Sequence, residues 1–183
     1  MIPTGHRRSS QSGFTLLEIA IVIFIMGLML TLVAPNIAGL HDARLKSEVR
    51  RLAGRSSYLY DRASAAKLVL RLTFDLDTNR YFVSRLDPLA VTPVFVLDDD
   101  PASAPVMLPA DVRIRDVAVE GTGQLAKGVI NTEYYPEGWV DATVVHLVND
   151  YGQVFTLKFN PLTGRTMIRR GDVPLKAALA MVN

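Results

Sequence analysis

The sequence FTLLEIAIVIFIMGLMLTLVA occupies residues 14–34, and Glu18 is its only charged side chain. Because a helix rises about 1.5 Å per residue, this run would reach roughly 31 Å, about the thickness of a bilayer's hydrocarbon core. Arg7 and Arg8 precede it, and no acidic residue does. Basic residues beside a membrane helix favour the cytoplasmic side. The pattern predicts one membrane-spanning helix at residues 14–34, with the rest of the chain exported.

Glu18 indicates more than a passive anchor. An ionised side chain inside a membrane costs about 2.5–3.5 kcal/mol on insertion scales, and less near the interface. Such a group needs a partner, and a positive charge on a neighbouring subunit would serve. A secretory signal fits less well, since its apolar stretch would span only about 7–15 residues before a small-residue cleavage site. A plain membrane anchor would leave Glu18 unexplained.

The residues Gly13-Phe14-Thr15-Leu16-Leu17-Glu18 resemble the processing site of type IV prepilins and of type II secretion pseudopilins. The resemblance implies that residues 1–13 are a leader and that a prepilin peptidase cuts after Gly13. It also implies that the same peptidase methylates Phe14 as the new N-terminus. Glu18 would then pair with the terminal amine of an adjacent subunit during assembly.

The helix is expected to continue beyond the membrane, over residues 35–67. Pro35 should break or kink the backbone ladder, because it lacks an N–H and crowds the preceding turn. Pilins commonly carry a proline at the corresponding position. Spacings of three and four then return, which is typical of an amphipathic helix lying on a sheet. The positions in this stripe are Leu45, Val49, Leu52, Ser56, Leu59, Ala63 and Ala66.

Residues 68–183 predict a β-rich head, expected to lie in the periplasm. Alternating apolar residues and turn signals predict strands at Leu68–Phe74, Arg80–Leu86, Val112–Val119, Ala142–Val148, Val154–Phe159 and Arg165–Arg169. Two stretches look irregular, the proline-rich Asp87–Ala110 and the glycine-rich Gly121–Gly138. The predicted fold class is α+β, pilin-like, with a long N-terminal helix packed on an antiparallel β-sheet.

Three features of the head are candidate binding sites. Asp98-Asp99-Asp100 could attract a cation, since hard cations take oxygen ligands, but a solvated loop tip is favoured because no glutamate follows at the usual spacing. The aromatic group of Tyr134, Tyr135 and Trp139 fits either an interface or the core. His146 has no partner identifiable from spacing and is interpreted as structural.

Composition excludes several functions. With 183 residues, the chain is about one domain in length, and its lack of cysteine excludes disulfides and thiolate metal sites. The three histidines show no metal-ligand spacing, so no metal or cofactor is expected. The pI near 9.0 needs no basic face to explain it, and no nucleic-acid partner is expected. No nucleophile motif, phosphate loop or carboxylate pair stands out, so the chain is predicted not to be an enzyme.

The part after the membrane helix resembles, more diffusely, the H-type minor pseudopilin of type II secretion. The resemblance rests on Arg50–Ala66, Leu68–Phe74, Phe155–Leu157 and Pro161–Gly164. It implies an inner-membrane subunit that joins other pseudopilins in the tip of a periplasmic pseudopilus and supports protein transport across the outer membrane. Prepilin peptidase, an inner-membrane assembly platform and membrane lipid would be its further partners. A minor type IV pilin for adhesion, motility or DNA uptake remains an alternative, as does a membrane-anchored periplasmic binding module.

Overall fold

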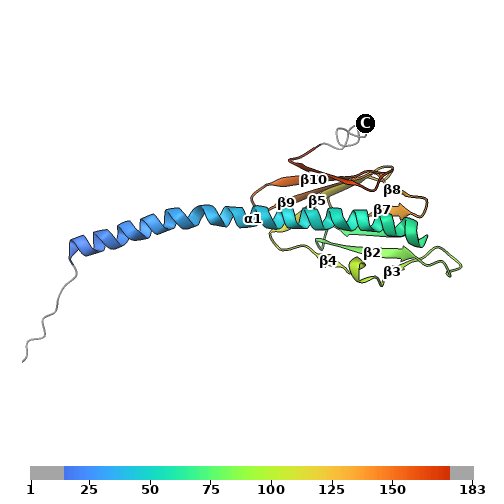
Figure 1. Ribbon diagram of the computed structural model, residues 1–183, viewed down its shortest axis with the longest axis horizontal. Coiled ribbons are helices and arrows are strands. Elements are labelled where there is room, and N and C mark those ends of the chain that lie inside the picture. The colour runs from blue at the N-terminus through green and yellow to red at the C-terminus, as the bar shows by residue number, and fades with distance from the viewer. Residues whose placement is uncertain (1–14, 174–183) are drawn as a thin grey trace, which may run out of the picture. The chain divides into compact units, whose positions relative to one another are not determined.

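The computed structural model describes residues 15–173, except for the side chains of residues 31–41. The chain divides into two compact units, residues 1–40 and residues 41–183, and each is described by itself. One helix, α1 (Leu16–Ala66), begins in the first unit and ends in the second. The second unit is a head in which the later part of α1 lies with two sheets (Figure 1).

The two sheets are built from antiparallel pairings throughout. Sheet A has the order β3-β2-β1-β7-β8, with β4 also paired to β2. Its strands are β1 (Leu70–Asp75), β2 (Arg80–Leu86), β3 (Phe95–Leu97), β4 (Val106–Met107), β7 (Val129–Tyr135) and β8 (Trp139–Val140).

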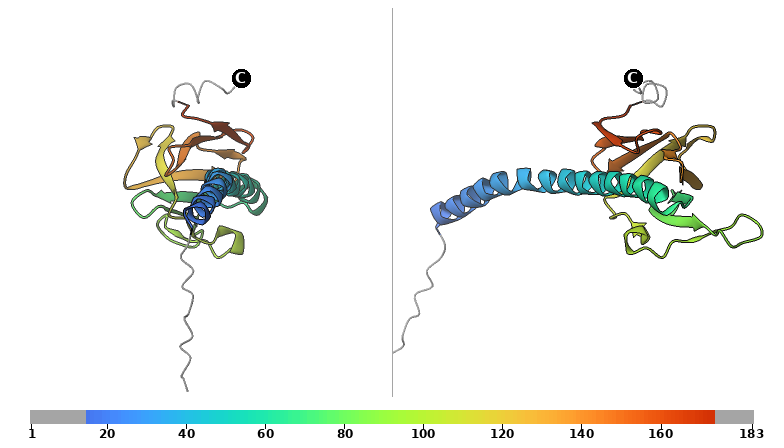
Figure 2. Two further views of the ribbon diagram at one scale, coloured as in Figure 1. Left: turned by 90° about the vertical axis from the view of Figure 1, so that its left-hand side faces the viewer. Right: turned by 45° about the vertical axis from the view of Figure 1, so that its right-hand side comes forward.

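Sheet B has the order β11-β10-β9-β5-β6. Its strands are β5 (Val112–Val119), β6 (Gly123–Leu125), β9 (Thr143–Asn149), β10 (Val154–Phe159) and β11 (Thr166–Arg170). A short 3-10 helix, η1 (Pro101–Ser103), lies between β3 and β4. In the two further views, strands β9 to β11 lie on one side of the later part of α1, and β2 to β4 lie on the other (Figure 2).

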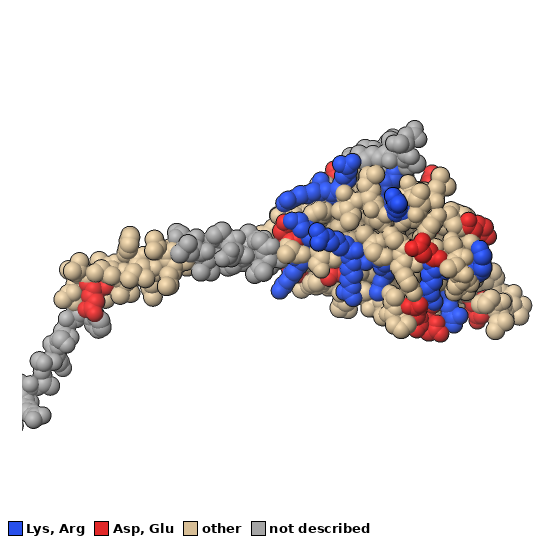
Figure 3. Space-filling view, viewed as in Figure 1, with Lys and Arg blue, Asp and Glu red and all other residues tan. Residues whose placement is uncertain are grey.

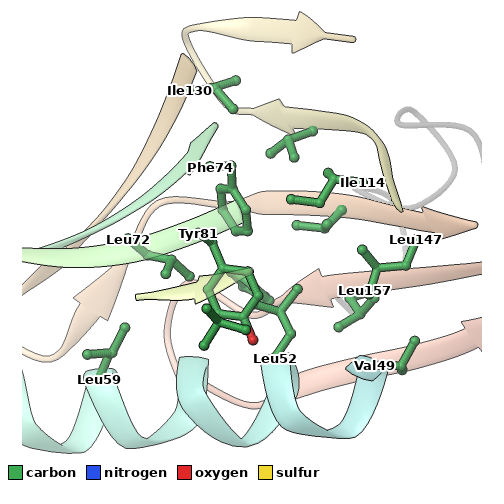
Figure 4. Packing of buried hydrophobic residues seen from close by; sticks show 14 of the residues in the cluster. Val49, Leu52, Leu59, Leu72, Phe74, Tyr81, Ile114, Ile130, Leu147 and Leu157 are labelled. Atoms are coloured by element: carbon green, nitrogen blue, oxygen red, sulfur yellow. The ribbon is translucent and has the colours of Figure 1, made fainter. Parts of the chain in front are cut away.

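The predicted helical stripe forms one wall of the core. Six of its seven positions are buried, namely Leu45, Val49, Leu52, Ser56, Leu59 and Ala63. They meet apolar side chains from both sheets, including Leu72, Phe74, Tyr81, Leu147 and Leu157 (Figure 4). Each buried leucine of this kind stabilises the fold by roughly 1.5–3 kcal/mol relative to an exposed one.

The last position of the stripe, Ala66, is exposed. The helix ends at this residue, and Lys67 takes a left-handed conformation with φ 57° that turns the chain into β1. Because the turn withdraws Ala66 from the sheets, it buries nothing. The prediction for this one position was wrong.

The fold class is confirmed, since a helix packs on antiparallel β-sheets, although there are two sheets rather than one. Both stretches predicted to be irregular contain strands. Gly121–Gly138 includes β7, whose residues Ile130, Thr132 and Tyr134 face the core in strict alternation. The proline-rich stretch includes β3, η1 and β4, which are short because the prolines interrupt pairing.

Candidate assembly surfaces

The first part of α1 exposes apolar side chains on every face. The large exposed apolar residues before position 31 are Leu16, Leu17, Ile19, Ile21, Val22, Ile23, Phe24, Ile25, Met26, Leu28, Met29 and Leu30. Figure 3 shows this segment as an uncharged surface with a single acidic patch. So large a contiguous apolar surface marks a site that is covered by protein or lipid.

The described residues include no helix that is both long and apolar enough to cross a membrane.

Glu18 is exposed in the first turn of α1, where the helix dipole favours a negative charge. Thr15 precedes the helix, and its Oγ1 accepts a hydrogen bond from the Glu18 backbone N–H at 3.3 Å. This is the order of a capping box, with threonine before the helix and glutamate three residues later. Thr15 was missed as a helix cap, although the Thr-x-x-Glu spacing was visible in the sequence. No described residue forms an ion pair with the Glu18 carboxylate.

The other predicted site residues of this segment are not tested. Gly13 and Phe14 lie outside the described residues. The helix α1 continues through position 35, but the side chain of Pro35 is among those not described. Cleavage, methylation and the kink stay predictions.

The acidic run at residues 98–100 is used inside the head. Arg62 of α1 makes a bidentate ion pair with Asp98, whose side chain is fully buried. Asp100 accepts a hydrogen bond from the Tyr58 hydroxyl at 2.9 Å and caps η1 through the Ala102 N–H. The interpretation as a solvated loop tip was wrong for these two acids, and it holds for Asp99, whose side chain is 81% exposed.

The surroundings of Asp98 favour its ionised form. Burial alone would raise the pKa of Asp98, but hydrogen bonds from Arg62 and Ser103, with the charges of Arg62 and Arg85, lower it below its usual range. Among the described side chains, no group of three or more potential ligands is placed to hold a metal ion. The guanidinium of Arg62 lies at the carboxylates of Asp98 and Asp100, where a cation would otherwise bind.

The aromatic cluster divides between core and surface. Tyr134 is fully buried, and its hydroxyl donates to Ser56 Oγ at 2.9 Å. Tyr135 and Trp139 stack with ring centroids 3.7 Å apart, and Trp139 is 41% exposed at the margin of sheet A. One member therefore belongs to the core, while the stacked pair forms part of the surface.

His146 is buried in a charge network that spacing could not reveal. Its Nδ1 lies 2.6 Å from Asp116 Oδ1 on the neighbouring strand, and its Nε2 lies 3.2 Å from the carbonyl oxygen of Val173. Arg115 contacts Asp116 at 2.6 Å and pairs with Asp172 at 2.8 Å. The network ties the chain after β11 to sheet B, so His146 is structural, as interpreted.

Comparison with known proteins matches the N-terminal segment to a motif. Residues 8–34 match a family model described as the prokaryotic N-terminal methylation motif. A stretch of 43 residues is 54% identical to the type II secretion system core protein G of Klebsiella michiganensis. This match covers 24% of the present chain and 30% of that protein. It therefore supports likeness in one segment only.

The chain thus carries an N-terminal methylation motif, and its head shares its fold with solved structures. Two solved structures of the minor pseudopilin EpsH from the type II secretion system of Vibrio cholerae match this fold. One crystal structure matches with a TM-score of 0.57 and 12% identity, covering 72% of this chain and 98% of that one. A second structure of EpsH matches with a TM-score of 0.53 and 14% identity, covering 72% and 99%.

Proposed function

We propose that this chain is a minor pseudopilin of the type II secretion system, acting in the tip of the pseudopilus. One observation carries the proposal. Residues 16–34 of the methylation motif belong to the same helix whose later residues form part of the core of a head with the EpsH fold. A filament subunit needs this continuity, because one helix then connects the segment that packs in the filament to the head.

The proposed organisation follows from that continuity. Residues 1–13 are a leader that prepilin peptidase removes after Gly13, and Phe14 is then methylated. Residues 14–34 hold the subunit in the inner membrane as a single span, residues 35–67 continue the helix, and residues 68–183 form the periplasmic head.

Assembly transfers the apolar helix from lipid to protein. At the inner-membrane platform, Glu18 of an incoming subunit meets the Phe14 amine of its neighbour, which sets the register. The exposed apolar surface before position 31 then packs against the same surface of other pseudopilins. The capping bond to Thr15 supports this role, since it fixes the first turn from which the carboxylate projects.

A structural rather than catalytic role is supported by the buried His146–Asp116 pair. Such a pair could orient a catalytic histidine if the second ring nitrogen faced a nucleophile or substrate. Here Nε2 faces the carbonyl oxygen of Val173, and His146 is only 2% exposed. The His146 imidazole is therefore inaccessible to a substrate.

The test is deletion of the gene, followed by complementation with the wild-type chain or with Glu18→Ala. The expected result is loss of secretion of proteins that fold in the periplasm, with surface pili unaffected, and rescue by the wild type. Glu18→Ala should be cleaved normally but fail to assemble and to restore secretion. Glu48→Ala, on the same helix, serves as the control and should restore it. Loss of pili with intact secretion would instead indicate the minor pilin.

A further inference from the structure

The strand β11 forms an open edge of sheet B. It is the last strand in the order β11-β10-β9-β5-β6 and pairs only with β10 among the described strands. It lies along the outer margin of the head in all three ribbon views (dark red in Figures 1 and 2). The other strands at sheet margins, β3, β4, β6 and β8, have only two or three residues, whereas β11 has five. Short edges resist pairing with other chains, and longer ones invite it.

The hydrogen-bond register shows which backbone groups are open. The Asn160 N–H donates to the Arg165 carbonyl oxygen, and the Gly171 N–H donates to the Val154 carbonyl oxygen. In an antiparallel ladder such pairs recur at every second residue. Met167 and Arg169 therefore bond to β10, while the N–H and C=O groups of Thr166, Ile168 and Arg170 point away from the sheet.

These outward groups have no partner among the described residues. Beside them, Met167 and Ile168 are 39% and 38% exposed. An edge of this kind offers main-chain hydrogen bonds for affinity and side-chain contacts for specificity to an added strand.

The charge along β11 selects the kind of strand. Arg165, Arg169 and Arg170 are exposed, and no acid of the described residues forms an ion pair with them. Two acids lie nearby. Asp42 is attracted by the charge of Arg170 but forms its ion pair with Lys46 at 2.6 Å, and Asp172 pairs with Arg115 at 2.8 Å. The edge is therefore basic.

Neither a second copy of β11 nor the residues that follow β11 in the chain fit this edge well. A second copy of β11 would bring both sets of arginines into one seam, and like charges across strands are unfavourable. Residues 171–173, which follow β11, turn inward, because the Val173 N–H donates to Thr156 Oγ1 of β10 and its carbonyl oxygen meets His146 of β9. Both contacts lie inward of the open edge.

We propose that the open edge of β11 binds an extended acidic segment of another protein by strand addition. The added strand bonds to the backbone of Thr166, Ile168 and Arg170 and places carboxylates beside Arg165 and Arg169. An apolar side chain of the same segment covers Ile168. The inference concerns an edge of the head and not the apolar segment before position 31, so it does not depend on the proposed secretion role.

The direct test uses the full chain, isotope-labelled in detergent micelles, with a capped nine-residue peptide of alternating glutamate and valine. Amide exchange at Thr166, Ile168 and Arg170 should slow at least tenfold on peptide addition, while Met167 and Arg169 are protected already. The control peptide carries lysine for glutamate and should leave these rates unchanged. Equal protection by both peptides, or protection by neither, would overturn the proposal.

Variants separate the edge from general effects of charge. Ile168→Pro removes an outward N–H and no ladder bond, so it should weaken acidic-peptide binding at least tenfold while the Met167 and Arg169 amides stay protected. Arg169→Glu should weaken binding about tenfold. Arg113→Glu makes the same charge change at an exposed position of β5 and should leave binding as in the wild type. Wild-type binding by Ile168→Pro, or equal losses for the two arginine variants, would contradict strand addition.

Discussion

The two parts of α1 use apolar residues in opposite ways. Before position 31, apolar side chains cover the whole circumference and all are exposed. From residue 45 to residue 63, they form one stripe that is buried against two sheets, and charged residues occupy the other faces. A helix that is apolar all round requires an apolar environment, whereas a striped helix requires only one apolar neighbour.

This difference shows that the two parts of one helix are stabilised by different surroundings. The later part is stabilised within the chain by its own head. The earlier part has no such partner among the described residues and depends on lipid or on other subunits. Changes in the two parts should therefore be measured by different assays, and matched substitutions can break or sharpen the comparison.

The largest expected effect comes from one substitution made in each part. Leu59→Ala removes a fully buried side chain and should lower the free energy of unfolding of the head by about 2–5 kcal/mol. Leu30→Ala makes the same change where the side chain is 70% exposed, and it should leave that free energy unchanged within about 0.5 kcal/mol. Urea unfolding of the full chain in detergent checks both. Equal losses would refute the separation.

The N-terminal part of α1 and the head also differ in how their acidic residues are paired, and this difference can be measured by changing the pH. Glu18 has no ion-pair partner among the described residues, whereas Asp116 lies among His146, Arg115 and Gln124. Burial would raise the pKa of Asp116, but the hydrogen bonds from His146 and Arg115 outweigh it and lower the pKa to about 2.

Because the folded pKa of Asp116 is depressed, its contribution is fully present above about pH 4 and is lost as pH falls toward 2. The contribution should be about 2 kcal/mol. Asp116→Asn should therefore be less stable than the wild type at pH 6, and the difference should shrink between pH 4 and pH 2. Unfolding curves across this range measure it, and a constant difference would argue against the depressed pKa.

A smaller loss is expected where α1 touches sheet A through a buried hydroxyl pair. Tyr134→Phe removes the donor to Ser56 Oγ and should cost about 1–2 kcal/mol, because a buried polar group is left unsatisfied. Adding Ser56→Ala should recover part of that loss. A double-mutant cycle by thermal unfolding tests this coupling, and strictly additive losses would show that the two side chains act independently.

The smallest effect is expected at the start of the earlier part. Thr15→Ala removes one of two acceptors of the Glu18 N–H, because the Thr15 carbonyl oxygen also accepts at 3.1 Å, and it should destabilise the first turn by about 0.5–1 kcal/mol. Amide exchange at Glu18 should quicken about two- to fivefold, while unfolding of the head is unaffected. Thr15→Ser keeps the hydroxyl and serves as the control. Unchanged exchange in the alanine variant would show that the hydroxyl does not cap the helix.

Local patterns predicted much of the fold. Arg80–Leu86, Val112–Val119 and Val154–Phe159 were predicted as strands with the bounds that the structure shows. Alternation was also present in β7, Val129–Tyr135, but surrounding glycines outweighed it and the strand was missed. Gly128 and Gly138 lie at the turns that bound this strand and have positive φ, so they end the strand rather than disrupt it.

Contacts between distant residues could not be predicted. Asp98 lies 36 positions from Arg62, and His146 lies 30 positions from Asp116, so nothing in the spacing of either pair marks it as a contact. From the sequence alone, an acid in a loop can be told from an acid in the core only by the residues next to it in the chain. The fold decides instead, because it brings α1 beside Asp98 and places β5 next to β9.

The central claim is that the earlier part of α1 becomes the N-terminus of an assembling subunit. Intact mass of the protein isolated from membranes, with and without prepilin peptidase, tests it most directly. The account predicts a chain that starts at methylated Phe14 only when the peptidase is present. A chain that starts at Met1 under both conditions would contradict the account and leave a membrane-anchored binding domain as the better description.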